Sequence, residues 1–325
     1  MMTTALQEKA PRKPLNAPEL SKDELKKQGE LAIYYDSSKC TACRGCQAAC
    51  KVWNELPSDI EKNAGTFSGS YQNPPDLLDN TRLIITFEER PREDRYGIDW
   101  AFGRRSCMHC TDAGCVKVCP SGCLYHDPDG TGLVVYDTEK CIGCQYCRSA
   151  CPFDVPRHTG VGVTGGGIKI NKCTGCVDRV RHGMAPACVS TCQPGALEFG
   201  PRDAMVAKAR KRVEELHAMG FNEARVYGAD ELDGCHVIHV LKYGMNMYQK
   251  MPENPKVNDA VNALNIMKPV AGLAAVGIAA GLGFSYLRGV GYKRDEMLYD
   301  AESENVIDTT TDEVVRHIDH EGGER

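Results

Sequence analysis

The stretch Cys141-Ile-Gly-Cys144-Gln-Tyr-Cys147-Arg-Ser-Ala-Cys151-Pro152 places four thiols within eleven residues and ends in proline. Three of the thiols follow one another at intervals of three residues, and the fourth comes four residues later. This is the C-x2-C-x2-C-x3-C-P pattern of cysteine ligands to bacterial iron–sulfur clusters. In that pattern a tight loop directs three thiolates at one cluster, and the fourth thiolate reaches a second cluster.

Three further cysteine runs repeat this pattern at the level of thiol spacing. The stretch above is the third of four runs. Runs two and three lie close together and both end in Cys-Pro, so we expect them to form one two-cluster unit, with runs one and four pairing outside it. The other runs are Cys40-x2-Cys43-x2-Cys46-x3-Cys50, Cys107-x2-Cys110-x4-Cys115-x3-Cys119-Pro120 and Cys173-x2-Cys176-x11-Cys188-x3-Cys192.

Exchange of the fourth thiolate between paired runs predicts four [4Fe–4S] clusters. Of the eighteen cysteines, this leaves out only Cys123 and Cys235, which we expect to be small buried hydrophobic residues. The predicted ligand sets are Cys107, Cys110, Cys115 and Cys151; Cys141, Cys144, Cys147 and Cys119; Cys40, Cys43, Cys46 and Cys192; and Cys173, Cys176, Cys188 and Cys50.

Zinc is the alternative metal, since it also accepts four thiolates. Structural zinc sites normally use two separated C-x2-C pairs, which the triple spacing does not match. A zinc-stabilised membrane scaffold without a redox role is therefore the competing function from a different class. The chain has no Ser-His-Asp set and no phosphate-binding glycine loop between a strand and a helix, so no catalytic residue is predicted.

One lysine and four histidines lie near the cysteine runs. Lys172, next to Cys173, is either a charge that tunes neighbouring clusters or an ordinary solvated lysine. Because every ligand set is already complete with thiolates, the nearby histidines are expected to be hydrogen-bonded or at the surface. These histidines are His109, His126, His158 and His182.

The order of elements predicts an α+β fold made of two bacterial-ferredoxin-like two-cluster units with loop insertions, followed by one C-terminal transmembrane helix. The formal net charge of −5 gives no electrostatic footprint for nucleic acid. Strands are expected at 31–35, 81–87, 132–136 and 237–241, and an amphipathic helix at 203–219. The predicted divisions are an arm at 1–30, the four-cluster domain at 31–200, an extension and linker at 201–266, the transmembrane helix at 267–288 and an acidic tail at 289–325.

The predicted membrane helix rests on Pro269–Leu287, nineteen residues without a charge. Gly277 and Gly281 form a small-xxx-small face against which another membrane helix can pack. Basic residues crowd its C-terminal end, which predicts a single-pass protein of the inner (plasma) membrane with a cytoplasmic tail and a periplasmic cluster domain. The tail from 295 to 325 is expected to be largely disordered, because it is strongly acidic.

Residues 1–30 contain no apolar core of a signal peptide, so we expect no cleavable signal. A cluster-loaded protein must cross a membrane already folded. We therefore expect it to travel with a partner that carries a twin-arginine signal.

The order and spacing of the four runs resemble those of the four-cluster electron-transfer subunits of molybdopterin oxidoreductases. Four stretches resemble the iron–sulfur β subunit of membrane-bound formate dehydrogenase more closely, and the likeness covers about residues 30–295. These stretches are Tyr71-Gln-Asn-Pro-Pro-Asp76, Cys107-Met-His-Cys110, Cys151-Pro-Phe-Asp-Val-Pro156 and Lys172-Cys-Thr-Gly-Cys-Val-Asp-Arg-Val180.

The resemblance implies an electron-transfer subunit that has no catalytic residue of its own. Its expected partners are a catalytic α subunit with molybdenum or tungsten bis-pterin that oxidises formate, a membrane cytochrome b γ subunit that passes electrons to quinone, and membrane lipid. One departure is Gln193, which separates Cys192 from the proline that would follow it directly, and it removes no ligand. The same relay role for another molybdopterin oxidoreductase or a hydrogenase is the alternative.

Overall fold

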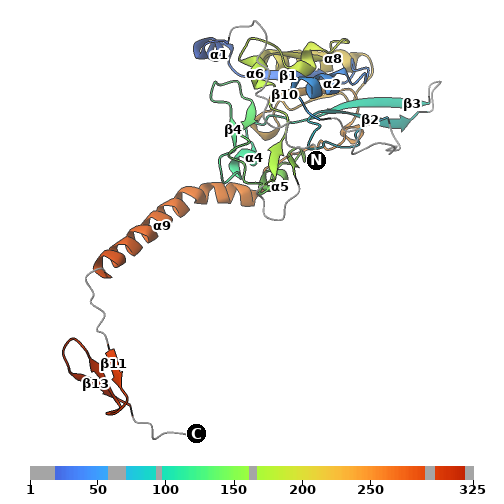
Figure 1. Cartoon of the computed structure of the whole chain (residues 1–325). Helices are drawn as coiled ribbons and strands as arrows, with labels where there is room; N and C mark the ends of the chain where they lie inside the picture. Colours follow the sequence, from blue (N-terminus) through green and yellow to red (C-terminus); the bar gives the residue numbers. More distant parts are fainter. Residues whose placement is uncertain (1–18, 58–70, 93–96, 161–166, 290–296, 319–325) are drawn as a thin grey trace. The chain divides into compact units, whose positions relative to one another are not determined.

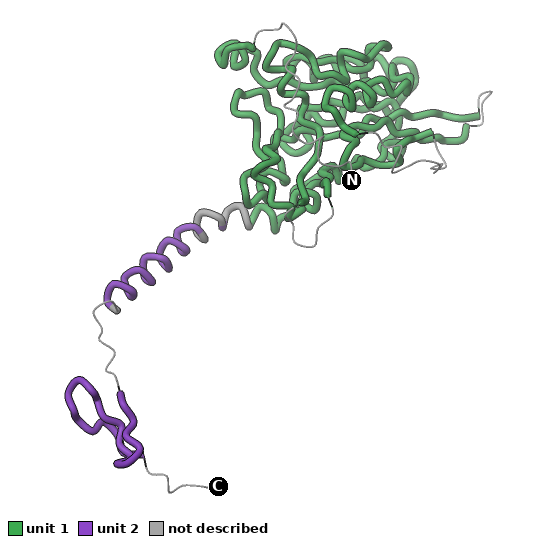
Figure 2. The backbone as a smooth tube through the Cα atoms, in the orientation of Figure 1, with its two compact units in different colours: residues 1–265 green, residues 266–325 purple. Residues whose placement is uncertain are grey.

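A computed structural model of the chain describes residues 19–57, 71–92, 97–160, 167–289 and 297–318. The chain divides into two compact units, residues 1–265 and residues 266–325 (Figure 2). The division falls inside one long helix, α9 (Asp259–Gly289). The two units are described separately below.

The first unit mixes short helices and short strands joined by loops, which confirms the predicted mixture of α and β structure (Figure 1). In chain order its elements are α1 (Lys22–Gln28), β1 (Leu31–Asp36), α2 (Gly45–Trp53), β2 (Ile84–Pro91), β3 (Ile98–Arg105), α4 (Gly114–Lys117), β4 (Leu124–His126), β5 (Val134–Tyr136), α5 (Tyr146–Ser149), β6 (Arg157–Thr159), β7 (Lys169–Asn171), α6 (Val177–Val180), α7 (Ala187–Ser190), β8 (Leu197–Pro201), α8 (Arg202–Ala218), β9 (Arg225–Tyr227), η1 (Glu231–Asp233), β10 (Val237–Leu241) and η2 (Met245–Met247).

A four-stranded sheet of order β8-β1-β10-β9 forms the centre of this unit. The central strand β1 runs antiparallel to β8 and parallel to β10, and all six of its residues are buried. Successive side chains of a strand point to opposite faces. Ala32 and Tyr34 accordingly pack with helix α8, whereas Ile33 and Tyr35 belong to the core that contains the cysteines. The sheet thus separates a helical layer from a cysteine-rich layer.

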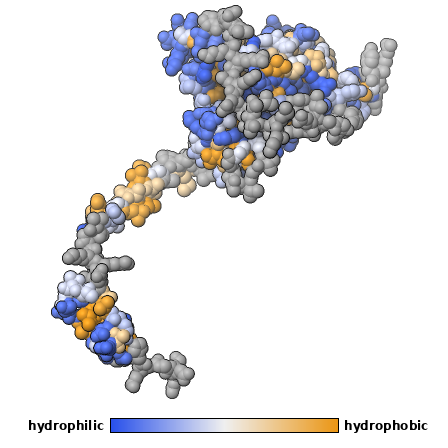
Figure 3. Space-filling view, in the orientation of Figure 1, coloured by the Kyte–Doolittle hydropathy of each residue, from blue (hydrophilic) through white to orange (hydrophobic). Residues whose placement is uncertain are grey.

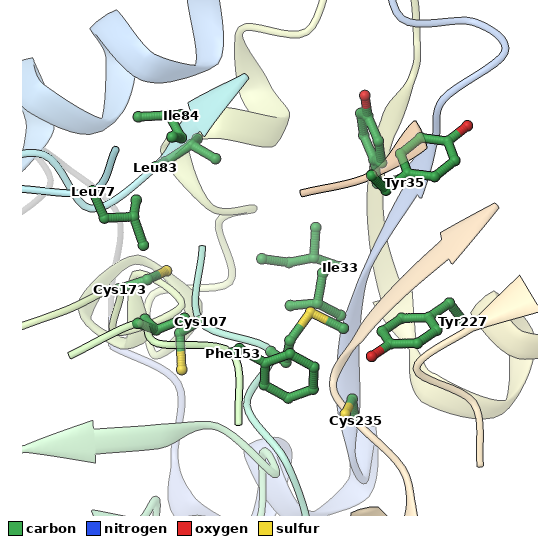
Figure 4. Close-up of a cluster of buried hydrophobic side chains, with 14 of the residues drawn as sticks. Ile33, Tyr35, Leu77, Leu83, Ile84, Cys107, Phe153, Cys173, Tyr227 and Cys235 are labelled. Atoms are coloured by element: carbon green, nitrogen blue, oxygen red, sulfur yellow. The ribbon is translucent and has the colours of Figure 1, made fainter. Parts of the chain in front are cut away.

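The cysteine-rich layer is also the largest hydrophobic core of the described residues. Cys107 and Cys173 are both 8% exposed and lie among Ile33, Phe153 and Tyr227 (Figure 4). The thiols are therefore integrated into the core.

Antiparallel hairpins separate successive cysteine runs. The pair β2–β3 lies between runs one and two, β4–β5 between runs two and three, and β6–β7 between runs three and four. Each hairpin reverses the chain, so that runs distant in sequence can return to a common core. The four-residue helices α4, α5, α6 and α7 each lie within a run.

Most predicted elements are confirmed with small shifts of their ends. The helix predicted at 203–219 is α8, and the strand predicted at 237–241 is β10. Strand β3 was not predicted, although it pairs with β2 along eight residues. The sheet includes β9 and β10, which follow residue 200, so it crosses the domain boundary predicted between residues 200 and 201.

The predicted N-terminal arm contains a helix in the part that the structure describes. Helix α1 begins after Ser21, whose hydroxyl accepts a hydrogen bond from the Glu24 amide while the Glu24 carboxylate accepts one from the Ser21 amide. This reciprocal capping box satisfies two amide groups that a helix start otherwise leaves free. Residues 1–18 lie outside the described residues.

The second unit contains the remainder of α9 and a three-stranded antiparallel sheet of β11 (Met297–Asp300), β12 (Asn305–Asp308) and β13 (Val314–His317). The prediction of a disordered tail is therefore wrong for 297–318. Apolar pairs recur every eight residues, with acidic turns between them, and the average acidity of the tail conceals this pattern. The pairs are Leu298-Tyr299, Val306-Ile307 and Val314-Val315.

Helix α9 covers the segment predicted to span a membrane, but it begins at Asp259, earlier than predicted, where Val261 is buried and Asn262 accepts a hydrogen bond from Lys117. Among the described residues, no helix has both the length and the apolar character needed to cross a membrane. The transmembrane helix predicted at 267–288 is thus not supported by the structure. Several apolar side chains of α9 are exposed (Figure 3); these are Leu273, Val276, Ile278, Leu282, Phe284 and Leu287.

Candidate metal-cluster sites

The first four-cysteine site joins runs one and four. Residues 123 to 138 positions apart meet here, and helix α2 packs against α7. Four thiols line a cavity with an empty volume of about 320 Å³, together with the side chains of Arg82 and Arg104. We call it the Cys173 cavity; its thiols are Cys50, Cys173, Cys176 and Cys188.

The second site joins runs two and three. Its cavity has an empty volume of about 390 Å³, and its apolar wall includes Val134, Phe153 and Leu232. The ammonium-bearing side chain of Lys172 also lines it. We call it the Cys107 cavity; its thiols are Cys107, Cys110, Cys115 and Cys151.

The third site takes the remaining thiols of runs two and three. Its cavity has an empty volume of about 290 Å³ and is lined also by His158 and by a fifth thiol, Cys123. In the part of the chain that the structure describes, no lysine or arginine lines it. We call it the Cys141 cavity; its ligand candidates are Cys119, Cys141, Cys144 and Cys147.

The last set of thiols, Cys40, Cys43, Cys46 and Cys192, is also brought together. The negative charges of Cys192 and Cys43 each raise the pKa of the Cys40 thiol, after the larger effect of burial. Cys40 and Cys192 act in the same way on the thiol of Cys46. The structure therefore gathers each predicted set of four thiols in one place. That these sets hold clusters is a prediction.

The loops between the first two thiols of the runs share one backbone feature. The residue two positions after the first cysteine has a positive φ in all four runs: 52° at Ala42, 50° at His109, 74° at Gly143 and 66° at Gly175. For a residue with a side chain, the left-handed conformation costs about 1–2 kcal/mol. Such strain persists where the surrounding structure requires it, commonly at functional sites.

The left-handed turn directs a backbone amide at a sulfur atom. The amide of Ala42 donates a hydrogen bond to Cys40 Sγ at 3.4 Å, and the amide of Gly175 donates one to Cys173 Sγ at 3.4 Å. Amide hydrogen bonds stabilise negative charge on sulfur and are among the interactions that set the potentials of iron–sulfur clusters. The strain and the hydrogen bonds together fit loops that hold thiolates around a metal cluster.

The protonation equilibria of the thiols support the same chemistry. Burial raises the pKa of Cys46, Cys50, Cys147 and Cys151 to about 12. Bare thiolates are therefore strongly disfavoured in these cavities at neutral pH. A bound metal deprotonates its thiol ligands outright, so these residues suit metal ligation better than free-thiolate chemistry.

The thiols of each set lie farther apart than a single-ion site requires. In the described part of the chain, no three His, Cys, Asp or Glu side chains lie close enough together to hold one metal ion. In a structural zinc site four sulfur atoms close around the ion at about 2.3 Å. The sets described above instead surround common cavities without converging on one ion, which fits a cluster of several metal atoms.

The histidines near the runs are hydrogen-bonded in three of four cases, as the prediction allowed. His109 is fully buried and its Nδ1 accepts a hydrogen bond from the Val134 amide at 3.0 Å. His158 Nε2 lies 3.5 Å from Cys147 Sγ, and His182 Nδ1 lies 2.7 Å from the Asp178 carbonyl oxygen.

The two remaining cysteines are buried, and both lie beside ligand candidates, which their sequence positions did not indicate. Cys235 is fully buried and forms an isolated strand bridge with Cys110. Cys123 is 2% exposed and lines the same cavity as Cys141. Arg104, buried among the thiols, was not singled out from the sequence. Its burial and its proximity to Cys188 arise only from the tertiary structure.

Comparison with known proteins places these sites in context. The family model described as 4Fe-4S dicluster domain matches residues 98–202, a stretch that contains runs two, three and four. The formate dehydrogenase-O iron–sulfur subunit of Escherichia coli (strain K12) is 38% identical over 292 residues, which cover 88% of this chain and 90% of that protein. The nitrate-inducible formate dehydrogenase iron–sulfur subunit of the same organism is 36% identical over 272 residues, covering 82% and 88%. The formate dehydrogenase iron–sulfur subunit of Haemophilus influenzae is 37% identical over 254 residues, covering 77% and 78%.

Proposed function

Because this chain belongs to the family of formate dehydrogenase iron–sulfur subunits, we propose that it relays electrons through four [4Fe–4S] clusters, from a subunit that oxidises formate towards a membrane cytochrome. The chain is the electron-transfer subunit of its complex and not the catalytic one. The zinc-scaffold alternative loses its support, since the relatives are iron–sulfur subunits.

The proposal assigns one cluster to each set of four thiols. The observation that carries it is that thiols from distant runs line common cavities, with the exchange of fourth cysteines typical of two-cluster ferredoxins. The proposed ligands are Cys50, Cys173, Cys176 and Cys188; Cys107, Cys110, Cys115 and Cys151; Cys119, Cys141, Cys144 and Cys147; and Cys40, Cys43, Cys46 and Cys192.

Bound clusters supply one-electron chemistry, and the protein supplies their surroundings. The thiols hold the clusters, and backbone amides such as that of Leu197, which donates to Cys192 Sγ at 3.3 Å, stabilise the charge on sulfur. Apolar side chains such as Phe153 and Leu232 keep water away from the Cys107 cavity. Exclusion of water lowers the reorganisation that accompanies each change of charge.

The partners and the location are part of the proposal. The names of the relatives support a catalytic formate-oxidising subunit as one partner, and the resemblance adds a molybdenum or tungsten bis-pterin in that subunit. A membrane cytochrome b subunit is the second proposed partner, and the cluster domain of this chain is proposed to lie on the periplasmic side of the plasma membrane. The exposed apolar side chains of α9 are the surface we assign to contact with that subunit and the surrounding lipid.

The decisive experiment measures iron and acid-labile sulfide in anaerobically purified protein and records its EPR spectrum after reduction. Four clusters require about sixteen of each per chain and overlapping, interacting signals. Addition of formate should reduce the same clusters when the catalytic subunit is present, and should not when it is absent. Protein with stoichiometric zinc and no iron would overturn the proposal.

Removal of residues 259–325 tests the assignment of α9. The truncated protein should retain its iron and lose co-purification with the membrane cytochrome. If it still co-purifies with the cytochrome, α9 is not the contact.

A further inference from the structure

Two cations are buried among the cysteine cavities. Arg104, at the end of β3, is 1% exposed, and Lys172, directly after β7, is 2% exposed. Long basic side chains are almost never fully buried unless they are paired. Within the described residues, neither makes an ion pair with a carboxylate.

Lys172 lies between two of the cavities. Its Nζ donates hydrogen bonds to the carbonyl oxygens of Val134 at 2.6 Å and Cys173 at 3.0 Å, and lies 3.7 Å from Cys107 Sγ. It therefore lines the Cys107 cavity while bound to the backbone of a cysteine that belongs to the Cys173 cavity. The solvated alternative considered for this lysine is excluded by its burial.

Arg104 lines the Cys173 cavity directly. Its Nη2 lies 4.0 Å from Cys188 Sγ, and its Nη1 donates to Ser106 Oγ at 2.5 Å. Among the described residues, its Nε has no hydrogen-bond partner. Its positive charge also acts on the thiol of Cys46, which belongs to the neighbouring set of run one. Arg104 thus faces thiols of two sets.

A buried charge without a partner is strongly destabilising. The hydrogen bonds of Lys172 and Arg104 go to neutral oxygen atoms, which solvate the cations without neutralising them. Among the described residues, the negative charges that act most strongly on both cations are those of cysteine thiolates, and Tyr136 adds a smaller one at Lys172. Clusters held by four thiolates carry net negative charge, so they are the natural counter-ions for both side chains.

Among the described residues, no such cation lines the Cys141 cavity. Its closest counterpart is Lys169, whose Nζ donates to the Cys141 carbonyl oxygen at 2.9 Å but does not line the cavity and is only half-buried. Cys144, one of its thiols, is exposed. Water therefore screens charges near this site much more than at the other two.

We propose that Arg104 and Lys172 are fixed cations that raise the reduction potentials of the clusters in the Cys173 and Cys107 cavities. The inference rests on the proposed function. Reduction adds one negative charge to a cluster, and a nearby positive charge in a low-dielectric interior favours that form. Both residues are positioning residues for electron transfer, since they act through the clusters.

The test is an EPR-monitored redox titration of the intact complex. Lys172→Met and Lys172→Gln both remove the charge and differ in polarity. Each variant should decrease the equilibrium constant for reduction of at least one cluster by about tenfold or more. This corresponds to a reduction potential lower by about 59 mV for a one-electron couple. Lys169→Met is the matched control, since this lysine also binds a cysteine carbonyl, and its shift should be clearly smaller.

Arg104 provides an independent pair of variants. Arg104→Gln should lower the potential of a cluster in the Cys173 cavity or the adjoining set of run one, whereas Arg104→Lys retains the charge and should stay near the original value. Every variant is assayed for iron. An original protein without iron–sulfur clusters would refute the proposed function itself.

Full iron content with unchanged potentials in Lys172→Met and Arg104→Gln would overturn only the present inference. Equal shifts for Lys169→Met and Lys172→Met would also overturn it, because burial would then be irrelevant. Loss of iron from Lys172→Met, Lys172→Gln and Arg104→Gln would show that the two residues are needed for cluster assembly. That result would also contradict the proposal that they raise reduction potentials.

Discussion

The Cys107 and Cys141 cavities arise from the same two cysteine runs and have different surroundings. Cys107 is buried in the main hydrophobic core, beside a buried lysine. The loop around the Cys141 cavity instead exposes Cys144, and Ile142 and Tyr146 are 57% and 58% exposed. The comparison teaches that ligand spacing specifies which thiols meet, whereas the surroundings that tune a cluster come from segments elsewhere in the chain.

The largest contrast is expected when one ligand candidate is removed from each cavity. Cys107→Ser should lower the iron content from about sixteen to about twelve per chain and also reduce the thermal stability of the first unit, because bound metal contributes to folding free energy. Cys141→Ser should lose the same iron with a smaller loss of stability, since its site is at the surface. Iron analysis and thermal unfolding measure both effects. Equal losses of stability would remove the distinction between the cavities.

Two glycine substitutions test how much packing around the sites contributes to stability. At Gly175, φ is +66° and an added Cβ would lie 2.7 Å from a methyl carbon of Leu133, so Gly175→Ala should cost about 2–5 kcal/mol from strain and overpacking. At Gly122, φ is +64° but nothing lies within 4 Å, so Gly122→Ala should cost only about 1–2 kcal/mol. Denaturant unfolding of the loaded protein gives the two values. A cost at Gly122 as large as that at Gly175 would contradict the packing argument.

Solvent access should distinguish the clusters kinetically. We expect the cluster of the Cys141 cavity to be lost several-fold faster than that of the Cys107 cavity when the protein is exposed to a chelator and a mild oxidant. The reason is the exposure of Cys144 compared with the burial of Cys107. The decay of individual EPR signals follows the losses, and the signal missing in Cys141→Ser identifies the first one. Simultaneous decay would show that exposure does not control release.

The smallest effects are expected at the two cysteines that are not ligand candidates. Cys123→Ala and Cys235→Ala should retain full iron and shift the potential of one cluster only slightly, because each removes a thiol beside a ligand candidate, Cys141 or Cys110. Redox titration and iron analysis measure the result. Loss of about four iron atoms from either variant would instead make that residue a ligand.

The corrections to the sequence-based expectations have different causes. The tail sheet at 297–318 and helix α1 both depend on short local patterns inside segments whose average composition is polar. Strand β3 depends on pairing with β2, and pairing partners are not encoded in the local pattern of one strand. The membrane helix was inferred from length and the absence of charge, and the described residues do not support it.

The sequence by itself indicated the three thiols of each set that come from one run, because tight spacing limits which thiols a loop can direct to a common point, and it carried the family resemblance. The fourth thiol of each set was predicted from the exchange typical of two-cluster ferredoxins. The sequence also indicated β1, β10 and α8 through their periodicity. Only the tertiary structure decided that strands from residues 31, 197 and 237 form one sheet, and that Lys172 and Arg104 are buried beside the thiols. Burial and electrostatic environment are sums over segments distant in the chain, so no local stretch of sequence contains them.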